Sequence, residues 1–152
     1  MTKAPGRYFE DYEVGQKFGS GTVTVTAEKI KAFAREFDPQ PFHLDEEAAR
    51  DTFFHGLAAS GWHTAAMTMR LFVDSEIKPD GGMIGAGGSD LTWPRPVRPG
   101  DVLHLESEVT ELRPSRTRPE IGIMKMRLTT YNQANDPVQI ASPTLIVPRR
   151  PH

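Results

Sequence analysis

The feature that most constrains the fold is a long segment, residues 57–75, that is apolar on nearly all sides. It predicts a helix that stays apolar until Arg70, and the first turns of this helix carry small side chains, Ala58 to Gly61. A helix that is apolar all round must be buried, and small residues let its backbone approach a neighbour closely. The rest of the chain must therefore supply a surface that covers this helix.

Strand-like runs supply that surface. Four of them follow the helix and are separated by turn formers: residues 83–94, 102–112, 121–131 and 138–147. The glycines in the first run indicate a bulge or a close backbone approach. Before the helix, the β-branched residues 22–26 predict a strand, and residues 27–37 predict an amphipathic helix with Thr26 as its N-cap. We predict an α+β fold in which an antiparallel sheet wraps around the long central helix.

Composition excludes several classes of protein. With 152 residues, the chain suits a single domain over 1–152, with an N-terminal arm at 1–20 and a tail at 148–152. It has no cysteine, which excludes a disulfide scaffold and thiolate metal sites. A net charge of -2 gives no general attraction to nucleic acid or to an anionic membrane. Because we find neither an apolar signal segment nor a run of the ~18 apolar residues that cross a bilayer, we expect a cytoplasmic protein.

An acid and an imidazole lie five residues apart in a segment, residues 37–45, that holds two prolines. Each proline fixes its own φ and steers the preceding residue away from helix, so Asp38 and Gln40 should be extended. A general acid or base must lie within hydrogen-bond reach of the proton that it moves. Asp38 and His43 are therefore candidate acid–base groups; the plain alternative is a helix cap and an ordinary loop histidine. For Asp45 we favour the capping role, at the start of a short helix.

A second junction lies at His55-Gly56, just before the long helix. Gly56 can leave peptide N–H groups open at the positive end of the helix dipole, where an electron-rich oxygen can bind. The alternative is that Gly56 only eases a tight turn. A metal site would have to draw on these loops, but His55 and His63 lie eight residues apart on an expected helix, which is not a recognised ligand spacing. We therefore expect no metal.

Three motifs carry a resemblance to a known family: Asp38-x-Gln40-Pro41-x-His43-x-Asp45, then His55-Gly56 before the small-residue helix, and the Pro-Val-Arg-Pro-Gly-Asp turn at 96–101. In these motifs the chain resembles the MaoC-like (R)-specific enoyl-CoA hydratases, which have the hotdog fold. The resemblance covers nearly the whole chain. It implies one antiparallel sheet around a central helix, as the strand pattern also predicts.

The resemblance also implies roles for individual residues. The family's loop motif is Asp-x-Asn-Pro-x-His, which places the catalytic acid at Asp38 and the histidine at His43, with Gln40 where asparagine is usual. Glutamine keeps the amide and adds a methylene, so we expect Gln40 among the substrate-binding residues, with local hydrogen bonds that differ from those of asparagine. An oxyanion-binding backbone N–H falls at Gly56, and a substrate-binding hydroxyl that is serine in the hydratases falls at Thr64.

The reaction implied is that of a hydro-lyase, the reversible syn addition of water to a 2-enoyl thioester to give a (3R)-3-hydroxyacyl thioester. Gly56 would stabilise the enolate, His43 would act as base, and Asp38 would donate the proton to the α carbon, with the reverse order left open. The substrate would be an acyl-CoA or another acyl thioester. No cofactor is expected, because CoA is part of the substrate.

The family implies a homodimer or a dimer of dimers with active sites at the subunit interface. Arginines in two turns are candidates for the phosphates of CoA: Arg95, Arg98, Arg113, Arg116 and Arg118. Two alternatives keep the fold and change the function: an acyl-CoA thioesterase, whose carboxylate would face the carbonyl carbon, and a subunit that binds acyl thioesters without catalysis.

Overall fold

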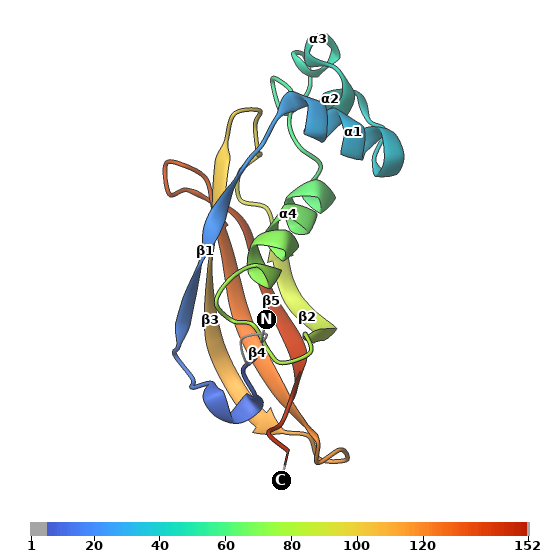
Figure 1. The fold of residues 1–152 in the computed structure, drawn as a ribbon. Coiled ribbons are helices and arrows are strands. Elements are labelled where there is room, and N and C mark those ends of the chain that lie inside the picture. Colours follow the sequence, from blue (N-terminus) through green and yellow to red (C-terminus); the bar gives the residue numbers. More distant parts are fainter. Residues whose placement is uncertain (1–5, 152) are drawn as a thin grey trace, which may run out of the picture.

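A five-stranded antiparallel sheet, in the order β1-β3-β4-β5-β2, curls around one long helix, α4 (Figure 1). A computed structural model describes residues 6–151 of the chain. The strands are β1 (Lys17–Thr24), β2 (Ile84–Thr92), β3 (Val102–Pro114), β4 (Ile121–Tyr131) and β5 (Pro137–Pro148). The predicted α+β hotdog architecture is confirmed, as are the positions of the four strands after the helix. The register of β2 against β5 shifts between Gly85 and Gly87, in agreement with the bulge that was one of the two alternatives for these glycines.

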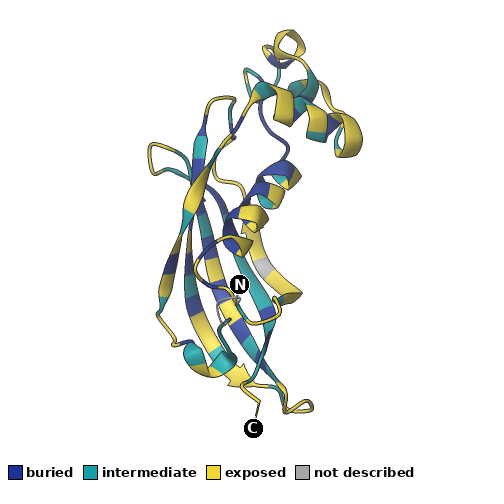
Figure 2. Cartoon of the chain, viewed as in Figure 1, coloured by how far each residue is buried: buried dark blue, intermediate teal, exposed yellow. Residues whose placement is uncertain are grey.

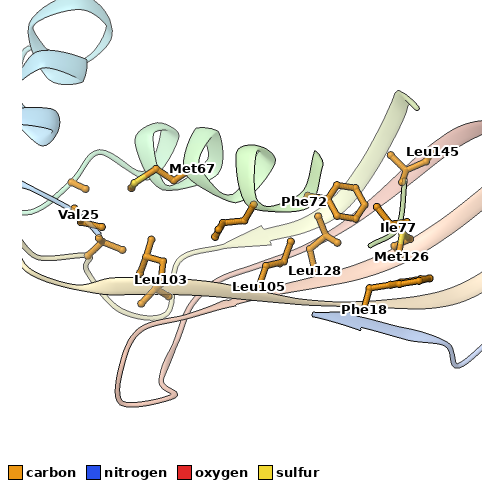
Figure 3. Packing of buried hydrophobic residues seen from close by; sticks show 14 of the residues in the cluster. Phe18, Val25, Met67, Phe72, Ile77, Leu103, Leu105, Met126, Leu128 and Leu145 are labelled. Atoms are coloured by element: carbon orange, nitrogen blue, oxygen red, sulfur yellow. The ribbon is translucent and has the colours of Figure 1, made fainter. Parts of the chain in front are cut away.

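The core lies between α4 and the concave face of the sheet. Along β4, Met124, Met126 and Leu128 are buried, while Lys125 and Arg127 between them are exposed. This alternation follows from the period of two along a strand, and Figure 2 shows it as bands of buried and exposed residues. Figure 3 shows side chains of the helix and of the sheet meeting in this layer. Fully burying one side chain of this size contributes about 1.5–3 kcal/mol, so the layer is the main source of stability.

Helix α4 spans Gly61–Val73 and is shorter than the predicted helix over 57–75. Residues 57–60 form no helix, because neighbouring segments bind their backbone. The Ala58 N–H donates to the Phe42 carbonyl at 3.0 Å, and the Ala59 N–H donates to the Val97 carbonyl at 2.9 Å. The helix therefore begins after Ser60, whose hydroxyl caps it by accepting from the Trp62 N–H at 3.3 Å.

Three short helices form a helical lobe that stands beyond one end of the sheet (Figure 1): α1 (Ala27–Phe37), α2 (Pro41–Leu44) and α3 (Glu46–Ala49). Thr26 caps α1 as predicted, its hydroxyl accepting from the Lys29 N–H at 3.2 Å. Asp45 caps α3 as predicted, its carboxylate accepting from the Glu47 N–H at 2.8 Å. Gln40 is extended as predicted, whereas Asp38, the C-cap of α1, has ψ 65° and is not. Pro41 begins the single turn of α2, a position where a backbone N–H would have no intrahelical partner.

The N-terminal arm is shorter than predicted. β1 already begins at Lys17, inside the range expected for the arm, and pairs with β3. Before it, a 3-10 helix, η1 (Phe9–Asp11), places the Phe9 ring where a side chain at Gly122 would otherwise lie. Residues 1–5 of the arm and residue 152 of the tail fall outside the described part. Within that part, no helix combines the length and apolarity needed to cross a membrane.

Candidate active site

Asp38 and His43 face each other at the junction of the helical lobe and α4. The Asp38 Oδ2 lies 3.4 Å from the His43 Nε2, and the two side chains are 20% and 6% exposed. On the other side of the ring, His43 Nδ1 lies 2.6 Å from the Ala58 carbonyl oxygen. A carbonyl only accepts, so Nδ1 carries a proton, and a neutral ring presents the Nε2 lone pair. The structure thus brings the predicted acid–base pair together and fixes the tautomer.

The carboxylate of Asp38 has polar partners on both sides. Gln40 Nε2 donates to Asp38 Oδ1 at 2.5 Å. Burial raises the pKa of Asp38, but hydrogen bonds from Ser60 and Gln40 and the charge of His43 outweigh it and hold that pKa below its ordinary value of 3.8. Asp38 is therefore a carboxylate at neutral pH. Gln40 acts on this carboxylate and does not itself line the adjacent pocket.

A pocket of about 390 Å³ opens beside His43. Its lining comes from α2, from the segment between α3 and α4, from the start of α4 and from the segment after β2: His43, Phe53, Phe54, Ala59, Gly61, Thr64, Trp93, Pro94, Arg95, Pro96 and Val97. Thr64 is 2% exposed and lines this pocket. A hollow of similar size, about 410 Å³, lies on the outer face of the sheet, but its acidic, basic and hydroxyl side chains are solvated and it holds no acid–imidazole pair.

Gly61 occupies the first position of α4 and the wall of the pocket. Among the hydrogen bonds within residues 6–151, none is donated by the Gly61 N–H, which is one of the open donors at the positive end of the helix. A Cβ at this position would lie 2.7 Å from the Trp93 ring, so the close packing requires glycine. Gly61 is the residue that sequence reasoning missed. The signal for Gly61 in the sequence is Ser60, a typical N-cap residue, which directly precedes it.

Gly56 does not lie at the helix end, contrary to expectation. It precedes the N-cap Ser60 by four residues, has φ 154°, and does not line the pocket. The expected helix start was wrong because residues 57–60 lie outside the helix, which begins at Gly61. His55 and His63 likewise stay apart from the pair, and residues 6–151 contain no group of three or more His, Asp or Glu side chains placed to hold a metal ion.

Comparison with known proteins gives consistent matches. Residues 10–131 match the model of the MaoC like domain family. A crystal structure of a MaoC-like dehydratase from Rhodospirillum rubrum superposes with a TM-score of 0.93 at 53% identity, covering 97% of this chain and 100% of that one. YdeM of Bacillus subtilis is 36% identical over 82% of this chain and 86% of its own length. An (R)-specific enoyl-CoA hydratase of Rhodospirillum rubrum is 33% identical over 72% of this chain and 74% of its own length.

Proposed function

The chain belongs to the MaoC-like domain family, and from this premise we propose that it is a hydro-lyase that adds water reversibly to a 2-enoyl thioester, giving a (3R)-3-hydroxyacyl thioester. One observation carries the proposal. The Asp38 carboxylate faces the His43 Nε2 at 3.4 Å, next to a pocket that also contains the open amide at the start of α4. Acid–base groups beside an oxyanion donor are what addition to a conjugated thioester needs.

The thioester oxygen gains negative charge when water adds to the β carbon. We assign the N–H of Gly61 to this oxygen, in place of the Gly56 N–H that the sequence suggested, because Gly61 begins the helix and lines the pocket. The positive end of the α4 dipole adds to the stabilisation of the enolate. Donors fixed in this way need no reorganisation as charge develops, so they lower the barrier more than water does.

The protons also balance. Since the lowered pKa makes Asp38 a carboxylate at rest, Asp38 accepts a hydrogen bond from the water and orients it. With its proton on Nδ1, the His43 ring takes a proton from this water at Nε2 as the water oxygen bonds to the β carbon. Nε2 then gives the same proton to the α carbon, and the ring and the carboxylate return to their starting states. In this proposal His43 is the base, as the sequence suggested, and it also supplies the α-carbon proton that the sequence assigned to Asp38.

A second copy of the chain is part of the proposal. Large apolar side chains are exposed on one face of α4 and along the edge strand β2 with the residue after it: Trp62, Met69, Val73, Ile84, Leu91 and Trp93. Trp62 is 60% exposed and its ring lies 5.5 Å from that of Trp93, so the face is continuous beside the pocket. Burial of such a face in a homodimer would remove apolar surface from water and close the pocket on its open side.

The test measures hydration of crotonyl-CoA and longer enoyl-CoAs by loss of the enoyl absorbance. Asp38→Asn and His43→Gln keep approximate shape, and each should lower kcat by about 10²–10⁴, with substrate affinity and folding retained. The double variant should be scarcely worse than the worse single one, because the two groups act on one water. Glu120→Gln, in a distant exposed turn, is the matched control.

Two outcomes would change the assignment. If both single variants kept more than about a tenth of the wild-type kcat, the reaction would not depend on this pair. Release of free CoA from saturated acyl-CoA, detected with a thiol reagent and lost in the same variants, would instead identify a thioesterase.

A further inference from the structure

Arg98 bridges two backbone carbonyls on a segment that is distant in sequence. Its Nη1 donates to the Leu57 carbonyl at 3.2 Å, and its Nη2 donates to the Phe54 carbonyl. These carbonyls are the first and last of a four-residue turn, residues 54–57. Hydrogen bonds from a guanidinium are roughly twice as strong as those between neutral groups. Arg98, which the sequence suggested as a candidate to bind a CoA phosphate, therefore donates two hydrogen bonds within its own chain.

The bridged turn has an unfavourable backbone. His55 has φ 53° and Gly56 has φ 154°, two consecutive residues with positive φ. Such conformations cost on the order of 1–3 kcal/mol each for residues other than glycine and persist only where the surroundings hold them. A Cβ at Gly56 would lie 3.3 Å from Arg98 Nη1, so the guanidinium also packs directly on the turn. Arg98 is the side chain that holds both ends of this turn.

The turn leads directly into the residue that orients the catalytic ring. The Ala58 carbonyl accepts from His43 Nδ1 at 2.6 Å, and the Ala58 N–H donates back to the lobe at the Phe42 carbonyl. Arg98 is itself fixed from the sheet side, because its backbone N–H donates to Asp101 Oδ2 at 2.9 Å. A short path of hydrogen bonds and covalent bonds thus runs from the 96–101 turn through Ala58 to the imidazole.

We propose that Arg98 is a positioning residue for His43: by bridging the carbonyls of Phe54 and Leu57 it holds the Ala58 carbonyl against Nδ1 and keeps Nε2 aimed at the reacting water. Arg98 touches no reacting atom. The expected effect of Arg98 on turnover rests on the proposed hydration reaction, whereas its expected effect on the His43 ring is independent of that reaction. Loss of an ordinary structural contact would lower stability in general, whereas loss of this bridge would change the tautomer and orientation of the His43 ring.

The kinetic test replaces Arg98 by Met, which keeps the aliphatic stem, and by Lys, whose single ammonium cannot span both carbonyls. A displacement of catalytic groups by about 1 Å costs up to about 10² in rate, so Arg98→Met should lower kcat by about 10- to 100-fold with KM nearly unchanged. Arg98→Lys should lie between Met and wild type. Arg118→Met is the control, because Arg118 is exposed in a distant turn and its guanidinium pairs with Glu120 at 2.8 Å.

The second readout is NMR of the His43 ring nitrogens at a pH where the ring is neutral, with no substrate present. Wild type should show the proton on Nδ1, and both Arg98 variants should show a mixture of the two tautomers. A folded Arg98→Lys protein with wild-type kcat and an unchanged tautomer would overturn the proposal, even if Arg98→Met failed to fold. If the wild type hydrated no enoyl-CoA, the proposed function would fail, and the ring signals would still decide the role of Arg98.

Discussion

Replacement of Gly61 by alanine tests the assignment of the oxyanion donor most directly. The new Cβ would lie 2.7 Å from Trp93 Cε2 and Cζ2 and 2.8 Å from Cδ2. Carbon atoms prefer separations of about 3.5–4.0 Å, so the ring and the helix start must move apart by about 1 Å. Trp93 resists the movement, because its Nε1 donates to the buried Gln139 Oε1 at 2.9 Å. Part of the shift therefore falls on the amide that we assign to the thioester oxygen.

The expected loss follows from that shift. Removing one oxyanion donor costs about 10²–10³ in kcat, and a misplacement of about 1 Å costs up to about 10², so Gly61→Ala should lower kcat by about 10². Overpacking should lower the free energy of unfolding by about 1–3 kcal/mol. The assay is enoyl-CoA hydration with a thermal melt of the same sample. Gly19→Ala is the matched control, since a Cβ there meets nothing within 4 Å.

A compensating change distinguishes steric displacement from other effects. Trp93→Leu removes the ring atoms that the new methyl would meet, so adding it to Gly61→Ala should restore part of the lost kcat. If Gly61→Ala retained kcat within about threefold of wild type, the start of α4 would not supply the oxyanion donor. A double variant no faster than Gly61→Ala alone would refute the steric argument.

Two further predictions concern pH. Ser60→Ala removes a hydrogen bond that lowers the pKa of Asp38, whereas the burial that raises this pKa remains. The acid limb of the kcat/KM profile, where the carboxylate becomes protonated, should therefore move to higher pH. An acid limb that does not move would contradict this prediction. Burial, together with the charge of nearby Lys29, lowers the pKa of His63 below 6.5. As pH falls through 6.5, the unfolded chain therefore binds more protons than the folded chain, and the folded state loses stability. Because His63 Nδ1 is buried without a hydrogen-bond partner in the described structure, His63→Phe should reduce this acid-side fall in Tm; an equal fall in both proteins would refute that role.

The sequence predicted most of the fold because periodicity and turn residues act locally. The strands over 102–112, 121–131 and 138–147 lie within β3, β4 and β5, and the caps at Thr26 and Asp45 form as expected. The start of the long helix was wrong. The composition of residues 57–60 predicted helix, but Ala58 and Ala59 donate their N–H groups to distant segments and these residues form no helix. The local sequence pattern carries no information about such partners.

The candidate site could likewise be predicted only in part. Asp38 and His43 could be predicted because their motif is contiguous and stiffened by proline. The Ala58 carbonyl, which sets the tautomer of His43, could not, since a backbone oxygen has no signature in the residue type. Nor could the role of Arg98, whose partners lie 41 and 44 residues away in the chain. Contacts at that separation depend on how the whole chain folds.

The two halves of the site belong to different parts of the molecule. The helical lobe carries the acid and the imidazole, whereas the body formed by the sheet and α4 carries the Gly61 amide and most of the pocket wall after β2. Changes on the body side, such as at Trp93, can therefore alter what fits in the pocket without changing the Asp38–His43 pair. A change at Asp38, which does not line the pocket, can alter the proposed chemistry without altering the pocket wall. Related chains with this architecture can diverge in substrate range and in reaction along separate routes.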